Sequence, residues 1–89
     1  MHAEDLKDAI FNLIFDDEST YRKHYVPTLH HMRKNPEDKD RIKELVDNAT
    51  MKLCKAKNIG YNMIPEDVKK ELAIDLYQEM INDEIDRSR

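Results

Sequence analysis

The chain has 89 residues and a mass of 10.6 kDa, which leaves room for one hydrophobic core and therefore for a single domain spanning 1–89. Charged residues make up 38% of the chain, but the net charge is only −4, so charge repulsion is weak and we expect the chain to fold. One cysteine excludes an internal disulfide and no apolar run could span a membrane, so we expect a cytoplasmic protein without membrane contact.

The first half of the chain predicts one regular helix and one broken one. With one glycine and three prolines, and no alternation of apolar and polar residues, the sequence favours an all-α fold. Leu6, Ile10 and Ile14 share one face of a helix expected from about Asp5 to Phe15. Ser19 or Thr20 is a candidate N-cap for the segment 21–34. Because proline breaks a helix interior, we expect short helices at 21–25 and from Pro27, separate or fused with a kink.

Two long helices are predicted in the second half. Asn35 as N-cap and Pro36 at the first helical position indicate a helix of about 22 residues, ending before a left-handed Gly60. Its apolar stripe includes Leu45, Leu53 and Ala56. Another helix opens at Pro65 and has no later breaker. The prediction is therefore a small bundle of three main helices plus the short proline-broken segment.

Charge alternates by segment along the chain. Residues 1–18 carry six acids and one base, 19–35 carry four bases and no acid, and 66–86 carry eight acids and two bases. Acidic and basic elements that pack side by side would explain this pattern without any function.

The last helix has apolar residues on two rows, more than one core-facing stripe needs. Either another part of the chain covers both rows, or one row contacts a second copy or another protein. The predicted partner-binding residues form an apolar row with an acidic rim: Ile74, Tyr77, Ile81, Ile85, Asp75, Glu79, Asp83 and Glu84. A basic face at 19–35 could meet an acidic partner through Arg22, Lys23, Arg33 and Lys34.

No catalytic, metal or cofactor site is predicted. His24, His30 and His31 lack the spacing of a ligand set, and Cys54 has no histidine at helical spacing to activate it. A single glycine excludes phosphate-binding loops. We therefore expect a protein that is not an enzyme and needs no cofactor.

Two nucleic-acid-related alternatives stay open. The spacing of Ala56, Gly60 and Pro65 is similar to that of the turn in a helix-turn-helix. Its second helix would present the carboxylates of Glu66 and Asp67 to the phosphates, which repel them, so nucleic acid is an unlikely partner. Alternatively, the acidic last helix could imitate phosphates and inhibit a nucleic-acid-binding protein.

Residues 36–86 resemble the PcfK-like proteins of conjugative plasmids and phages. The resemblance rests on the segments Lys34-Asn35-Pro36, Lys55-Ala56-Lys57-Asn58-Ile59-Gly60, Pro65-Glu66-Asp67-Val68, Leu72-Ala73-Ile74-Asp75-Leu76-Tyr77 and Glu79. Asp75 stands where the family usually has histidine, and Leu76 where it has an aromatic residue. The resemblance implies a small accessory or regulatory protein of a mobile element, and together with the apolar row it predicts a non-enzymatic protein that acts through protein–protein binding.

Overall fold

The computed structural model describes the backbone of residues 3–87 and the side chains of residues 5–82. This part of the chain contains helices and no strand, which confirms the all-α prediction. The elements in chain order are α1 (Ala3–Asp16), α2 (Glu18–Thr20), the π-helix η1 (Tyr21–Tyr25), α3 (Val26–Lys34), α4 (Asp40–Lys57), the 3-10 helix η2 (Tyr61–Met63) and α5 (Glu66–Arg87). In the same part, no helix combines the length and the apolar character needed to cross a bilayer.

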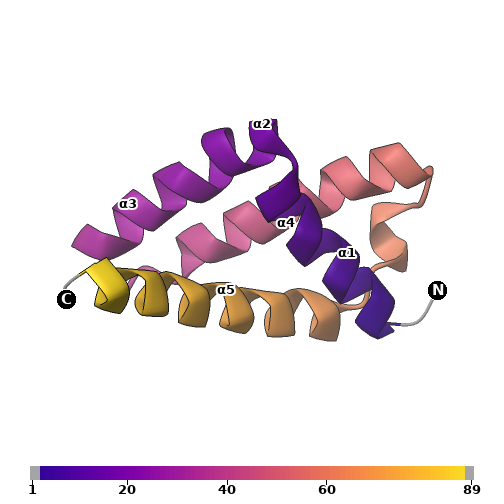
Figure 1. Cartoon of the computed structure of the whole chain (residues 1–89). Helices are drawn as coiled ribbons and strands as arrows, with labels where there is room; N and C mark the ends of the chain where they lie inside the picture. Colours follow the sequence, from indigo (N-terminus) through magenta and orange to yellow (C-terminus); the bar gives the residue numbers. More distant parts are fainter. Residues whose placement is uncertain (1–2, 88–89) are drawn as a thin grey trace.

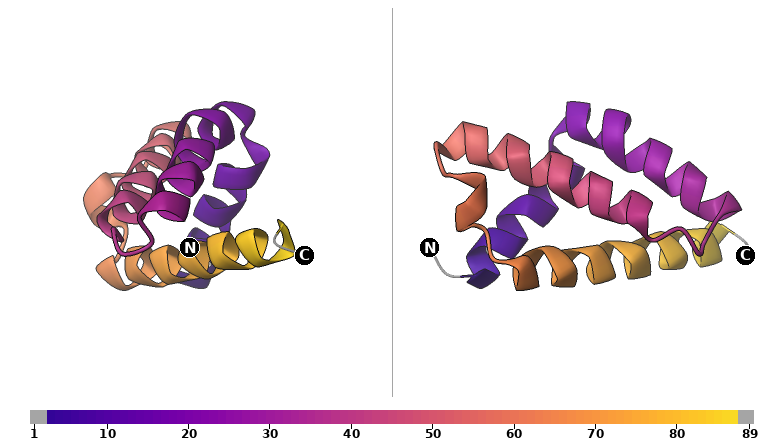
Figure 2. Two further views of the ribbon diagram at one scale, coloured as in Figure 1. Left: turned by 90° about the vertical axis from the view of Figure 1, so that its left-hand side faces the viewer. Right: turned by 180° about the vertical axis from the view of Figure 1, so that it is seen from behind.

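The helices enclose one elongated core. α5 runs along one long side of the molecule, α3 and α4 lie across from it, and α1 crosses between them (Figures 1 and 2). α1 contacts both α4 and α5, so it closes one face of the core between them. The molecule measures 41 × 24 × 19 Å.

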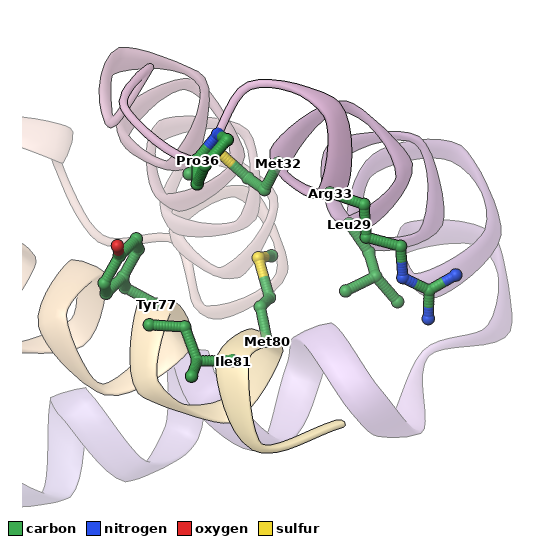
Figure 3. Close-up of a pocket in the computed structure, with 7 residues that line it drawn as sticks. All are labelled: Leu29, Met32, Arg33, Pro36, Tyr77, Met80 and Ile81. Carbon is green, nitrogen blue, oxygen red and sulfur yellow. The ribbon is translucent and has the colours of Figure 1, made fainter. Parts of the chain in front are cut away.

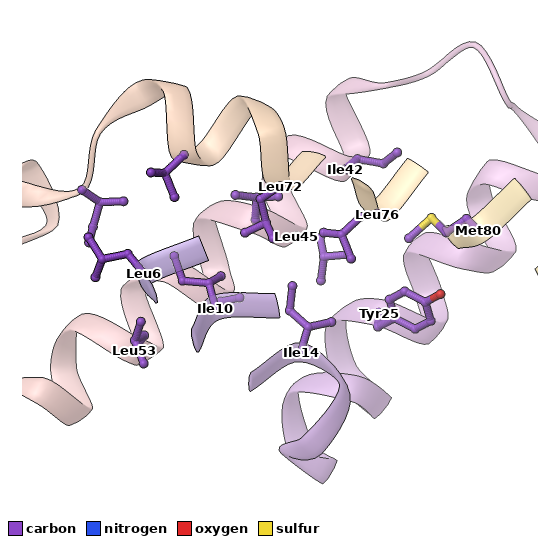
Figure 4. Close-up of a cluster of buried hydrophobic side chains, with 14 of the residues drawn as sticks. Leu6, Ile10, Ile14, Tyr25, Ile42, Leu45, Leu53, Leu72, Leu76 and Met80 are labelled. Atoms are coloured by element: carbon purple, nitrogen blue, oxygen red, sulfur yellow. The ribbon is translucent and has the colours of Figure 1, made fainter. Parts of the chain in front are cut away.

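α1, α4 and α5 each send an apolar row into this core (Figure 4), and η1 and α3 add Tyr25, Leu29 and Met32. The predicted face of α1 is buried at Leu6, Ile10 and Ile14. α4 buries most of its predicted stripe, but Ala56 is exposed, because the last turn of α4 projects beyond the helices it packs against. The row that α5 contributes is fully covered and consists of Val68, Leu72, Leu76 and Met80.

The segment from Glu18 to Lys34 is one continuous helical run, so the fused alternative agrees with the structure and two separate short helices do not. Asp17, rather than Ser19 or Thr20, caps it, because its carboxylate accepts hydrogen bonds from the backbone and the hydroxyl of Thr20. The π-helix accommodates Pro27, whose ring would clash with the preceding turn of an α-helix. In this wider turn the Val26 N–H donates to the Tyr21 carbonyl, five residues earlier. The helix therefore passes the proline without a break.

The sequence Asn35-Pro36 ends a helix instead of starting one. Asn35 closes α3 with φ −135° and ψ 69°, because a residue before proline is driven out of the helical region. The Asp38 N–H then donates to the Asn35 carbonyl in a turn, and α4 begins at Asp40. The predicted start of this helix was therefore several residues too early.

The end of α4 also differs from the prediction. Asn58, with φ 56° and ψ 45°, adopts the left-handed conformation, whereas Gly60 is extended with φ −71°. The N–H groups of Asn58 and Ile59 both reach the Cys54 carbonyl, so this turn is complete before the glycine is reached. The prediction assigned this conformation to Gly60 because glycine adopts it without steric cost, but asparagine tolerates it as well.

Candidate protein-binding surface

The outer face of α5 carries apolar side chains that its own chain leaves exposed. Ile74 is 57% and Ile81 37% exposed, while Tyr77 between them is half-buried. These three residues share one side of the helix because they are three and four positions apart. Ile85, Asp83 and Glu84 from the same predicted surface lie outside the described side chains.

Tyr77 and Ile81 line a small apolar notch between α3 and α5, together with Leu29, Met32, Arg33, Pro36 and Met80 (Figure 3). Its volume is about 20 Å³, enough for a water molecule or a methyl group. The Lys39 ammonium lies 5.3 Å from the centre of the Tyr77 ring and adds a positive charge beside it. The notch is therefore too small for a metabolite but could receive the end of one apolar side chain.

Asp75 and Glu79, the two acids of the predicted rim whose side chains the structure describes, lie on the opposite flank of α5 from this notch. Asp75 binds the Lys7 ammonium of α1 at 2.7 Å, and Glu71 lies 3.8 Å from the same group. This pairing raises the pKa of Lys7, chiefly through the hydrogen bond to Asp75. Glu79 is exposed and makes no ion pair with another described side chain. The structure therefore divides the predicted surface into an apolar side and an acidic side.

The acidic side forms an open depression of about 310 Å³ where α1 adjoins α5. The residues that line it are Lys7, Asp8, Phe11, Asp75, Gln78, Glu79 and Asn82. Three of them are carboxylates and one is a lysine, so the depression is negatively charged. Sequence reasoning did not include Lys7, Asp8 or Phe11, because nothing in the sequence shows which helix α1 packs against.

The four residues of the predicted basic face do not lie together. Arg22 and Lys23 lie in η1, while Arg33 and Lys34 end α3, a separation of roughly 16 Å along the helix. Arg22 pairs with Glu18 at 2.6 Å, and Arg33 lines the notch beside Tyr77. Lys23 and Lys34 are exposed. The basic segment thus presents two separate pairs of cations.

The candidate metal ligands are dispersed. His31 pairs with Asp38 at 2.8 Å, His24 lies 3.5 Å from the Asn48 amide, and His30 is exposed. Cys54 is buried as a small apolar residue. Within residues 5–82 no three metal-ligating side chains come together.

Two polar clusters that the sequence did not indicate fix the ends of the helices. Asp17 accepts hydrogen bonds from Lys52 and Thr20, which lower its pKa to about 2. In the second cluster, the Tyr61 hydroxyl donates a hydrogen bond to Asp47 at 2.7 Å and accepts one from Lys69 at 3.2 Å. The bond to Asp47 raises the pKa of Tyr61. These clusters tie loops to helices and are structural.

A helix-turn-helix does not match the connection between α4 and α5. Residues 58–65 separate the two helices and include η2, whereas that motif has a turn of three to four residues. The buried row of α5 packs on α4 and α1. At the start of α5, Glu66 pairs with Lys69 at 2.9 Å, and this pairing lowers the pKa of Glu66.

Comparisons with protein-family models, with curated proteins and with solved structures find no match to this chain. The resemblance to PcfK-like proteins stays a prediction.

Proposed function

We propose that this chain is a small non-enzymatic accessory or regulatory protein that binds another protein through the outer face of α5. The observation that supports this most directly is the contrast between the two sides of α5: Leu72 and Leu76 are fully buried, while Ile74 and Ile81 face solvent. Burying an isoleucine contributes about 1.5–3 kcal/mol, so covering these two side chains with a partner would be favourable. The resemblance to PcfK-like proteins would place this activity in a plasmid or phage.

The proposal predicts that position 74 touches the partner. A photo-crosslinking residue placed at position 74 should give a discrete adduct in extracts of the organism that encodes the chain. The same residue at position 63 is the matched control, because Met63 is 72% exposed but lies in η2, away from this face. Equal labelling at both positions, or none at 74, would refute the proposal.

A substitution tests the same surface without a crosslinker. Ile74→Glu should abolish capture of the partner and leave the helical circular dichroism and the melting temperature nearly unchanged, because the side chain is exposed. Met63→Glu should affect neither. If Ile74→Glu instead unfolds the chain, this row belongs to the core and the proposal is wrong.

The proposed acidic inhibitor of a nucleic-acid-binding protein is the second candidate. The observation in its favour is that acidic α1 lies beside acidic α5. Under this candidate the same crosslinker would trap a nucleic-acid-binding protein. Nucleic acid added before irradiation would compete for that protein and reduce the yield of the adduct.

A further inference from the structure

Two acidic helices lie side by side in this protein. α1 belongs to a segment with six acids and one base, and α5 carries five acids and two bases over residues 66–82. α1 packs on the basic elements η1 and α4, but it also contacts acidic α5 directly. At this junction Lys7 is the cation that lies between the carboxylates of the two helices. The junction therefore has an excess of negative charge that the described side chains leave uncompensated.

We infer that the partner covers this face with a cationic amphipathic helix, which lies along the α1–α5 junction and packs its apolar side chains on Ile74. This inference rests on the proposed function, because it names the chemistry of the partner that the α5 face binds. Lysine or arginine side chains of that helix would enter the depression beside Asp8 and Glu79, with their methylene stems against the Phe11 ring. Neither Asp8 nor Glu79 makes an ion pair with another described residue.

The position of the apolar side chains favours a helix as the partner. Ile74 and Ile81 are seven residues apart, which is two turns, and form a ridge along α5. Such a ridge fits between the side chains of a second helix. Residues 3–87 offer no strand edge, so an extended peptide could not bind by adding a strand.

The charges also decide on which side of α5 the partner lies and argue against a second copy. Lys39 places a cation above the Tyr77 ring on the α3 side of α5, whereas Asp8, Asp75 and Glu79 line the α1 side, so a cationic helix is drawn to the α1 side. Two copies paired through α5 would bring two acidic helices together, which is repulsive. A cationic helix from another protein avoids both conflicts.

A synthetic amphipathic helix of about 18 residues, with leucine on one face and lysine on the other, is a suitable probe. Its binding to the full chain can be measured by fluorescence anisotropy at physiological ionic strength. Asp8→Lys and Glu79→Lys should each weaken binding about tenfold, and Ile74→Ala should weaken it by a similar factor. Glu44→Lys is the matched control, because it makes the same change in net charge at an exposed position of α4. It should alter binding less than twofold. Lys39→Glu should not weaken binding.

The inference fails if Glu44→Lys weakens binding as much as Glu79→Lys, because the probe would then sense only net charge. It also fails if a peptide with glutamate in place of lysine binds equally well. A dimer in sedimentation that Ile74→Glu dissociates would show that a second copy covers Ile74 and would overturn both proposals. The first two results leave the proposed function intact when the crosslink at position 74 still traps another protein. Loss of that crosslink would overturn the proposed function itself.

Discussion

The end of α4 offers a direct test of the structure, because the sequence and the structure assign the left-handed residue differently. Asn58 has φ 56°, in the left-handed region, which costs most residues with a Cβ about 1–2 kcal/mol. Asparagine bears a smaller cost there because its side chain can hydrogen-bond locally. Alanine would bear the full cost, so Asn58→Ala should lower the free energy of unfolding by about 1 kcal/mol. Asn58→Gly should be neutral or slightly stabilising.

Gly60 should respond in the opposite direction. Its φ of −71° suits any residue, and an added Cβ would lie 3.7 Å from the nearest atom, Cγ of Met63, which is an ordinary contact. Gly60→Ala should therefore stabilise the chain by about 0.4–1 kcal/mol, since alanine reduces the freedom of the unfolded state.

Urea denaturation followed by far-ultraviolet circular dichroism measures both effects. For a domain of this size, 1 kcal/mol corresponds to a shift in melting temperature of about 4–8 °C, so thermal melts provide an independent check. The Asn58→Ala variant should melt below the natural chain and the Gly60→Ala variant at or above it. A Gly60→Ala variant that loses 1 kcal/mol or more, beside an unaffected Asn58→Ala variant, would show that the glycine is the left-handed cap and refute the reasoning.

Three further predictions concern the core and the polar clusters. Leu72→Ala should cost about 2–5 kcal/mol in urea denaturation because the side chain is fully buried, while Ile74→Ala should change stability by less than about 0.5 kcal/mol; equal losses would contradict the two-sided description of α5. Asp17 should titrate at about 2 by NMR, below the ordinary value of 3.8, so the stability it contributes is present above pH 4 and is lost as the pH falls through 2. Lys52→Met should raise the pKa of Asp17 and weaken this acid dependence, and an unchanged titration would show that the pair does not form in solution. Tyr61→Phe should cost about 0.5–1 kcal/mol, and the natural phenol should ionise above its usual pKa in an absorbance titration; an ordinary phenol pKa would argue against the bond to Asp47.

The sequence alone determined the helical class and most of the core. Apolar spacing located α1 and the buried row of α5 because a helix that packs on one side repeats its apolar residues every three or four positions. Pro65 correctly marked the start of α5, since proline is favoured in the first helical turn. These are local properties, and they do not depend on which elements become neighbours.

Tertiary structure decided what local signals left ambiguous. Asn35-Pro36 fits the start of a helix as well as the end of one, and in the folded chain Asn35 closes α3. Likewise, Pro27 lies within a helix because a π-turn provides an alternative hydrogen bond. The candidate surface depended on packing even more strongly. The rows on α5 were visible in the sequence, but no local rule shows that α1 lies on the acidic flank and α3 on the apolar one, since both follow from how distant segments meet.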